Sequence, residues 1–517
     1  MSVLRNTLTQ SGWTLGSRAL GFVRDLVILA KLGAGPVADA FFTALMFPNL
    51  FRRVFAEGAF AQAFVPAYAR TMEAEGEDAA RKLAEETLRG LLAVTAGLVI
   101  LAQIAMPWIM LLLHGGYRND PVHFPLAITL TQITMPYLAF MALAALLSGV
   151  LNSAGRFAMS AGAPTLLNFC LLAAAFIGGD NYAVARSLSI AVTVAGALQV
   201  ALLWYGVSRQ KIRLRIGLPK LTPGVKRVAA LAIPGTIAAS GMQINIVVSQ
   251  ALASFERGAK SWLYSADRLY QLPLGLVGVA VGLAILPRLA RAARSADDGA
   301  SRDIMDNGVG LAMALTVPAA AALMAAPFLF IDSFFTRGDF TTEDAQLTAQ
   351  ALFHFGWGVP AFVLIKVLAP GFFAREDTKT PMNFSLISVA VNTIVGAGLF
   401  FYLKSQGVYG FPGLAIATSS AAWVNAALLF LTLKKRDWYN PGPELLKRLV
   451  SVSVASAALA GLLWYLASIS DQIAAVTLDS KFIAALLIAL AGAIAYVVFA
   501  LIFGAIRLSD MKGAMRR

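Results

Sequence analysis

The sequence predicts an all-α protein that crosses a membrane many times. Of its 517 residues, 58% are hydrophobic and only 14% are charged, and the mean hydropathy is +0.71. Soluble chains average about 45–50% apolar and about 25% charged residues, so this composition fits a soluble protein poorly. The apolar residues form long continuous runs, not the alternating pattern of an outer-membrane barrel. These features indicate a polytopic helical membrane protein and exclude a disordered chain, collagen or a coiled coil.

The lengths of the apolar runs define the individual helices. About 20 mostly apolar residues span a bilayer as a helix, and this length predicts about 14 spans. Polar turns such as 178–181 and 405–407 separate them. The first run is interrupted by Arg18 and Arg24, so we expect no cleavable signal peptide. The predicted spans are 8–32, 36–67, 88–112, 125–152, 158–178, 183–207, 228–254, 261–287, 305–335, 345–373, 381–403, 411–433, 448–468 and 482–506.

The distribution of Lys and Arg between alternate loops predicts the topology. With a cytoplasmic N-terminus, the termini and the loops on that side carry about 28 Lys and Arg, and the opposite loops carry about seven. The richest loop, 209–215, falls on the cytoplasmic side, as does 434–436. We therefore expect both termini in the cytoplasm. The same bias accounts for most of the net charge of +14, so we expect no nucleic-acid partner.

A short repeat predicts the domain organisation. The sequence AFVPAYAR at 63–70 ends the second predicted span, and AILPRLAR at 284–291 ends the eighth. Both stretches leave the membrane on the same side, which predicts two parallel six-helix lobes related by an axis along the membrane normal. We therefore expect an N-terminal lobe over residues 1–227, a C-terminal lobe over 228–436, and two further helices with a tail over 437–517.

Charged residues inside the predicted spans point to a site. An Arg at the centre of a membrane helix costs about 2.5–3.5 kcal/mol on insertion scales, so such residues by default indicate function. Thr14, Ser17, Arg18, Gly21, Arg24 and Asp25 recur at helical spacing and form one polar stripe on the first span. Such a stripe either lines a water-filled cavity or pairs with polar groups inside a packed bundle. The charged residues of the other spans are Asp39, Arg52, Arg53, Glu57, Asp267, Arg268 and Lys366.

The sign of these charges and the absence of enzyme motifs limit the function. A cavity with excess positive charge attracts anions, above all phosphates, which Arg grips through two hydrogen bonds. The sequence contains no Gly-Lys pair of a Walker A loop, no His-Glu-x-x-His and no Gly-x-Ser-x-Gly. With one cysteine, Cys170, and three separated histidines, we expect neither a disulfide framework nor a metal site. The pattern predicts a transporter of an anion, not an enzyme.

Seven short segments give the chain a specific resemblance. It resembles the MurJ (MviN) family of lipid II flippases, whose fold is that of the multidrug/oligosaccharidyl-lipid/polysaccharide (MOP) exporter superfamily. The likeness extends in order from the first predicted span through the eleventh. The matching segments are SRALGFVRD at 17–25, ADAFF at 38–42, PNLFRR at 48–53, FAEGAF at 55–60, APTLLN at 163–168, ADRL at 266–269 and KVLAPGFF at 366–373.

The resemblance implies roles for individual residues. It implies two six-helix lobes around a central cavity, with the last two helices supplying a hydrophobic groove for the lipid tail. The residues implied to bind the substrate, an undecaprenyl-pyrophosphate-linked peptidoglycan precursor, are Arg18, Arg24, Arg52, Arg268, Ser17 and Asn168. The residues implied to line the cavity or gate it are Asp25, Asp39 and Glu57.

We therefore expect a lipid II flippase of the bacterial inner membrane that works by alternating access. It would carry its substrate from the cytoplasmic to the periplasmic leaflet for cell-wall synthesis, without a cofactor or a bound metal. Membrane potential or an ion gradient would supply the energy. Its expected partners are lipid II, membrane lipids and enzymes of cell-wall synthesis. Two alternatives stay open: a flippase for another undecaprenyl-linked glycan, and a non-transporting scaffold for cell-wall enzymes.

Overall fold

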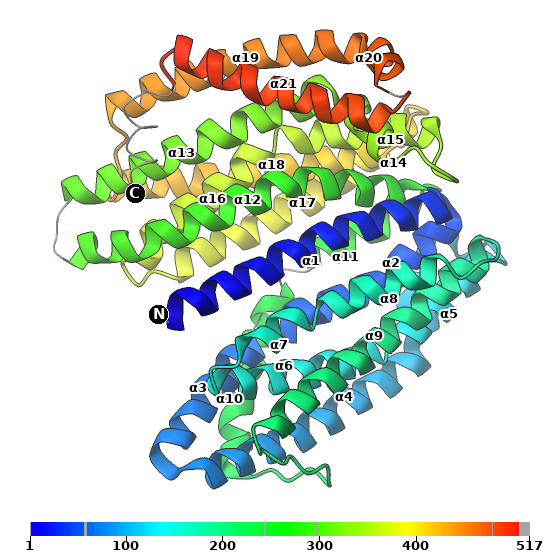
Figure 1. The fold of residues 1–517 in the computed structure, drawn as a ribbon, viewed down its shortest axis with the longest axis vertical. Coiled ribbons are helices and arrows are strands. Elements are labelled where there is room, and N and C mark those ends of the chain that lie inside the picture. Colours follow the sequence, from blue (N-terminus) through cyan, green and yellow to red (C-terminus); the bar gives the residue numbers. More distant parts are fainter. Residues whose placement is uncertain (1, 56–58, 242–243, 295–297, 478, 506–517) are drawn as a thin grey trace. The chain divides into compact units, whose positions relative to one another are not determined.

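The part of the chain that the structure describes consists of helices joined by loops. This computed structural model describes residues 2–55, 59–241, 244–294, 298–477 and 479–505, and within these ranges it contains no strand (Figure 1). In the first half the helices are α1 (Ser2–Leu32), α2 (Pro36–Phe55), α3 (Ala59–Glu75), α4 (Glu77–Leu113), the 3-10 turn η1 (Gly115–Tyr117), α5 (His123–Thr134), α6 (Tyr137–Ser153), α7 (Phe157–Gly162), α8 (Thr165–Ala175), α9 (Asn181–Arg209), α10 (Pro223–Gly241) and α11 (Ile244–Ala253). In the second half they are α12 (Ala259–Arg294), α13 (Asp298–Ala325), α14 (Pro327–Phe335), α15 (Thr342–Gly356), α16 (Val359–Phe373), α17 (Lys379–Ser405), α18 (Phe411–Lys435), α19 (Pro443–Ser468), α20 (Ser470–Val476) and α21 (Lys481–Ile502).

Ten helical segments of the described chain are long and apolar enough to cross a membrane. Several expose most of their apolar surface: only 17% of the apolar window of α17 is buried inside the chain, as suits a helix surrounded by lipid. The all-helical, multi-pass class expected from the sequence is confirmed. The number of about 14 spans stays a prediction.

The chain forms two compact units. The first comprises Met1–Ser261 and Arg337–Phe340, and the second comprises Trp262–Thr336 and Thr341–Arg517. The chain therefore passes from one unit to the other at three places. The lobes predicted from the sequence repeat begin and end at other residues than these units. A division by compactness does not test a repeat, so the predicted lobes stay a prediction.

In the first unit, small residues bring long helices close together. Helix α9 packs against both α6 and α8, and α1 packs against α8. At Gly196 of α9, a Cβ atom would lie 2.7 Å from the ring of Tyr137 and 3.0 Å from the side chain of Phe140. A larger residue would push α6 away, so this glycine sets the spacing of the two helices. On α3, the rings of Phe60 and Phe64 stack with their centroids 5.7 Å apart, and both belong to the apolar core of this unit.

The second unit is built in the same way around α13. This helix packs against α15, α16 and α19, and α19 packs in turn against α21. The hydroxyl of Tyr496 in α21 donates to the carbonyl of Ala314 in α13 at 2.6 Å. Helix α15 begins with a capping box, in which Thr341 accepts from the N–H of Asp344 and the Asp344 carboxylate accepts from the N–H of Thr341. Residues of α13, α14, α19 and α21 share one apolar core.

Two glycines of the first unit allow a contact between main chains. The N–H of Asp339 donates to the carbonyl of Ala30 at 2.9 Å. A Cβ at Gly338 would lie 2.0 Å from the Ala30 oxygen, and one at Gly33 would lie 2.5 Å from the Asp339 oxygen. Both glycines have positive φ, +67° at Gly33 and +57° at Gly338, a conformation that residues with a Cβ rarely adopt. A main-chain hydrogen bond thus links the segment 337–340 to the end of α1.

Candidate functional site

The polar face of α1 meets α8 at a cluster of four predicted site residues. Nε and Nη2 of Arg24 both donate to one carboxylate oxygen of Asp25, at 2.9 and 2.6 Å. Nη1 of Arg24 donates to the side-chain oxygen of Asn168 at 2.7 Å. The amide nitrogen of Asn168 donates to the backbone oxygen of Ser17 at 2.9 Å and to its hydroxyl at 3.4 Å. The structure therefore brings Ser17, Arg24, Asp25 and Asn168 together.

Burial makes the Arg24 pair energetically important. Arg24 is 9% exposed and Asp25 is 2% exposed, so both charges are largely removed from solvent. Neighbouring residues of a helix point in different directions, so the guanidinium must fold back to reach the carboxylate. Removing one member of such a pair leaves an uncompensated buried charge, which costs about 3–5 kcal/mol. In this conformation the charge of Arg24 is neutralised by an ion pair inside the helix bundle. This is the second of the two alternatives that the polar stripe left open, the first being a water-filled cavity.

The remaining predicted arginines differ in their surroundings. Arg18, on the same helix as Arg24, is exposed. Arg268 of α12 belongs to the second unit and is half-buried, with its guanidinium carbon 4.4 Å from the ring centre of Tyr264. The side chain of Arg52 and the whole of Glu57 lie outside the described residues.

Asp39, expected to line or gate the cavity, is fully buried in the first unit, where it caps the beginning of α12. Its carboxylate accepts the N–H of Gly258 at 2.9 Å and the N–H of Ser261 at 3.0 Å. It also accepts the hydroxyls of Ser261 at 2.7 Å and Tyr117 at 2.8 Å. Free N–H groups at a helix start favour an acceptor with negative charge. Asp39 therefore supplies from α2 the cap that α12 does not provide from its own sequence.

Next to Asp39, a lysine is held by three acceptors. Lys260 is fully buried, and its Nζ donates to the hydroxyl of Thr43 at 2.7 Å and to the carbonyl of Leu113 at 2.8 Å. Its third partner is Nδ1 of His114 at 3.0 Å. An ammonium has three N–H groups and no acceptor, so Nδ1 of His114 must accept. The three contacts match the three donors of a charged lysine.

His114 is suited to this role because it stays neutral. It follows the last residue of α4 and is fully buried, with its ring stacked on that of Tyr117 at 4.3 Å. Burial, together with the nearby charge of Lys260, lowers the pKa of His114 to about 2. A neutral imidazole can accept on one nitrogen, whereas an imidazolium would repel the ammonium.

Sequence reasoning placed Asp39 and Thr43 on one face of the second predicted span but missed His114, Tyr117 and Lys260. The only local signal is a lysine directly before a predicted span, and such a lysine is usually explained by the membrane interface. The acceptors of Lys260 are 147 residues away at Leu113 and 217 away at Thr43. No periodicity within one helix can reveal such a combination.

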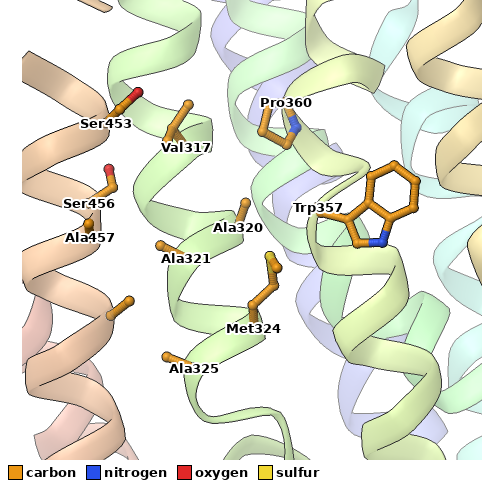
Figure 2. Close-up of a pocket in the computed structure, with 11 residues that line it drawn as sticks. Val317, Ala320, Ala321, Met324, Ala325, Trp357, Pro360, Ser453, Ser456 and Ala457 are labelled. Atoms are coloured by element: carbon orange, nitrogen blue, oxygen red, sulfur yellow. The ribbon is translucent and has the colours of Figure 1, made fainter. Parts of the chain in front are cut away.

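An apolar groove of about 440 Å³ lies in the second unit. Figure 2 shows Ala320, Ala321 and Met324 of α13 between the side chains of α19 and those of Trp357 and Pro360. The groove exists because small side chains do not fill the space between these helices. Its lining residues are Val317, Ala320, Ala321, Met324, Ala325, Trp357, Pro360, Ser453, Ser456, Ala457 and Ala460.

The described residues contain no group of three or more His, Cys, Asp or Glu side chains that could hold a metal ion.

Comparison with known proteins supplies the family. The family model "Lipid II flippase MurJ" matches residues 28–486. A protein of Rhizobium meliloti (strain 1021) named "Probable lipid II flippase MurJ" is 44% identical over 469 residues, which cover 90% of this chain and 86% of that protein. The "Lipid II flippase MurJ" of Burkholderia cenocepacia is 37% identical over 473 residues, with 90% of each chain covered.

Solved structures agree with the sequence comparison. A structure described as "Lipid II flippase MurJ, inward closed conformation" matches with a TM-score of 0.80 and 25% identity, over 96% of this chain and 98% of that one. An inward-facing multidrug resistance MATE transporter of the MOP superfamily matches with a TM-score of 0.64, over 81% of this chain and 94% of its own. At 14% identity this second likeness concerns the fold alone. The family model, the two relatives and the shared fold together establish that the chain belongs to the lipid II flippase MurJ family.

Proposed function

We propose that this protein translocates lipid II from the cytoplasmic to the periplasmic leaflet of the bacterial inner membrane. Membership of the MurJ family supports the substrate. The observation that carries the proposal is the buried Arg24 guanidinium, held by Asp25 and Asn168 on the polar face of a membrane helix. A cation placed there at such cost is a functional feature by default.

The chemistry of arginine explains how such a site would work. A guanidinium is always charged and presents a planar fork of donors that fits phosphate oxygens as well as carboxylates. The pyrophosphate of lipid II would compete with the Asp25 carboxylate for Arg24, and Arg18 and Arg268 would add positive charge. The bound anion would leave when the site changes its exposure between the two sides of the membrane. No bond is made or broken, so the proposed activity is transport without catalysis and without a cofactor.

The apolar groove of the second unit suits the lipid part of the substrate. Its lining is aliphatic apart from Trp357, Met324 and two serines, and one wall is α19. An isoprenoid chain gains free energy from apolar contact but needs no specific polar partner. We propose that the groove receives part of the tail while the rest stays in the bilayer.

The orientation follows from the charged loops. Lys and Arg concentrate in loops on one side of the predicted topology, which supports cytoplasmic termini. An association with enzymes of cell-wall synthesis is part of the same proposal, because such enzymes consume the translocated precursor.

Translocation of labelled lipid II in cells depleted of their own flippase tests the proposal. The natural chain should restore translocation, while Arg18→Ala and Arg268→Ala should not, although both variants reach the membrane. Lys82→Ala, which removes an exposed cation of α4, is the matched control and should behave as the natural chain. Full activity of both arginine variants would contradict the cationic site. Failure of the natural chain would favour another lipid-linked glycan or a scaffold.

A further inference from the structure

The segment between α9 and α10 carries an unusual concentration of positive charge. Residues 209–227 contain seven Lys and Arg and no Asp or Glu, and all seven side chains are exposed. The seven are Arg209, Lys211, Arg213, Arg215, Lys220, Lys226 and Arg227. Among the described residues, Lys211, Arg213 and Arg215 form no side-chain ion pair. This charge is therefore available to an external anion.

The segment has a defined conformation, because the first unit holds it from behind. Its backbone is non-helical from 212 to 222, and Leu214 is only 8% exposed within the core that α3, α4, α6 and α9 share. Nε of Arg89 donates to the carbonyl of Arg215 at 3.0 Å. The hydroxyl of Thr222 donates to the Glu86 carboxylate at 2.7 Å. These anchors determine which side chains face outward.

Three of the outward side chains are large and aliphatic. Ile216 is 67% exposed, Leu218 is 84% exposed and Leu221 is 78% exposed. They alternate with the cations within a few residues. Exposed apolar side chains this close together indicate a binding surface.

The position of the segment along the chain indicates what covers it. Helix α9 is one of the membrane-spanning candidates and ends at Arg209, so the segment begins where that span leaves the bilayer. Near this end Tyr205 is 55% exposed, and Arg209 lies over its ring at 5.7 Å. Tyrosine and arginine are common at the level of the lipid headgroups. The segment thus starts at the membrane surface.

We propose that residues 209–221 bind the surface of the surrounding bilayer through anionic phospholipid headgroups. Lys211, Arg213 and Arg215 contact the phosphates, while Ile216, Leu218 and Leu221 enter the boundary between headgroups and acyl chains. Basic clusters directly beside a membrane helix attract anionic lipid, and the attraction decays within a Debye length. Aliphatic side chains among the cations add the apolar contact typical of interfacial segments. This inference depends on the chain being embedded in a membrane and not on the proposed substrate.

A fluorophore on the full-length protein tests the proposal. In a Cys170→Ala background, Pro219→Cys places one thiol in the segment without removing a cation or an aliphatic residue. The protein, labelled with an environment-sensitive dye, is reconstituted in nanodiscs of phosphatidylcholine with increasing phosphatidylglycerol. Emission and quenching by neutral acrylamide are then recorded. We expect a blue shift and reduced quenching as phosphatidylglycerol increases, both reversed at about 1 M salt, where the Debye length is about 3 Å.

Charge variants separate this surface from general effects of charge. Changing Lys211, Arg213 and Arg215 to Gln should raise the phosphatidylglycerol fraction needed for the shift, with each lost cation weakening the interaction about fivefold. The control changes Lys379, Lys434 and Lys435 of the second unit to Gln, three exposed cations outside the segment, and should leave the shift unchanged.

Three results would overturn the proposal. One is an emission that does not respond to phosphatidylglycerol in the protein with its natural cations, a comparison that does not depend on the charge variants folding. Another is an equal loss of the shift in the control variant. The third is a shift produced by an acidic peptide added to pure phosphatidylcholine nanodiscs but not by phosphatidylglycerol, which would assign the surface to an acidic protein.

Discussion

The carboxylate of Asp39 binds Ser261 twice, accepting its backbone N–H at 3.0 Å and its hydroxyl at 2.7 Å. The two residues are 222 positions apart, and both are fully buried. A helix start normally obtains its cap from the residue just before it. Here α2 provides the cap for α12, so the first turn of α12 is fixed within the first unit.

Asp39→Asn should destabilise this contact. The amide keeps one acceptor but turns a donor toward the N–H and hydroxyl groups that the carboxylate now binds. Each buried group left without a partner costs about 1–3 kcal/mol, so we expect a clear fall in the apparent Tm in detergent. Asp78→Asn, at a side chain that is 95% exposed, should leave the Tm unchanged. Equal Tm values for the two variants would show that the cap carries little free energy.

Lys260→Met should be at least as damaging. It leaves the hydroxyl of Thr43, the carbonyl of Leu113 and Nδ1 of His114 without their donor, and it removes a charge that interacts with Asp39. Each buried group left without its partner costs about 1–3 kcal/mol. A double-mutant cycle with Thr43→Val tests the specific contact and should give a coupling of about 0.5–3 kcal/mol. Additive losses of stability would contradict the direct hydrogen bond.

Arg24→Lys tests geometry apart from charge. Lysine keeps the positive charge, but its donors share one nitrogen and lack the planar fork of a guanidinium, so it cannot keep the same contacts with Asp25 and Asn168. We expect a loss of about 1.5–3 kcal/mol, the worth of a hydrogen bond to a charged group, and reduced translocation of lipid II. The exposed Lys82→Arg exchange should affect neither measurement. Normal transport by Arg24→Lys would mean that charge alone is sufficient at this position.

The loop between α16 and α17 should confer a pH-dependent contribution to stability. The Asp377 carboxylate accepts the hydroxyl of Thr380 at 2.7 Å and Nη1 of Arg436 at 2.6 Å, and these contacts lower its pKa to about 2 from an ordinary 3.8. A carboxyl whose pKa is depressed on folding stabilises the protein above its unfolded pKa and loses that effect as the pH falls through the folded value. Asp377→Asn should therefore lower the Tm at pH 7, and the difference should shrink between about pH 4 and about pH 2.

The exposed Asp303→Asn variant is the control for that measurement. Its Tm should follow that of the natural chain at every pH. A difference between Asp377→Asn and the natural chain that stays constant down to about pH 2 would mean that the carboxylate charge is not responsible.

The groove of the second unit allows a test by filling. Ala457→Phe puts a ring into space that the lining alanines leave open, and we expect less lipid II transport with little change in Tm. Val454→Phe on the same helix, at a side chain that is 44% exposed and outside the lining, should transport normally. Equal transport of lipid II by the two variants would show that the groove does not bind the substrate.

Much of the architecture follows from local patterns. Long apolar runs predict membrane helices because a helix satisfies its own backbone in lipid, and the described chain consists of helices joined by loops. Three residues of the polar stripe on α1, Ser17, Arg24 and Asp25, lie in one hydrogen-bonded cluster, because helical spacing fixes which side chains share a face. Whether Arg24 faces a cavity or an ion pair could not be decided from the sequence. Its ion-pair partner Asp25 is the next residue and points in a different direction along a regular helix, and Asn168, which binds the other side of the guanidinium, is 144 residues away.

The buried lysine shows the limit of this reasoning more sharply. One of its three acceptors is the main-chain carbonyl of Leu113, and every residue type offers such a group. Only the folded chain determines that α4 ends where its last carbonyl meets Lys260. Hydrophobic periodicity along the sequence cannot predict this contact between Lys260 and the carbonyl of Leu113.

The backbone contact between Ala30 and Asp339 limits how the chain can be divided experimentally. A single cut after Ser261 yields a fragment with most of the first unit, but the segment 337–340 that completes it stays on the other fragment. Reassembly of two co-expressed halves would therefore require the loop 337–340 of one fragment to dock against Ala30 and Gly33 of the other, with almost no tolerance for added side-chain bulk at Gly33 or Gly338. The protein is better suited to insertion of a tag in an exposed turn than to separation into independently folding halves.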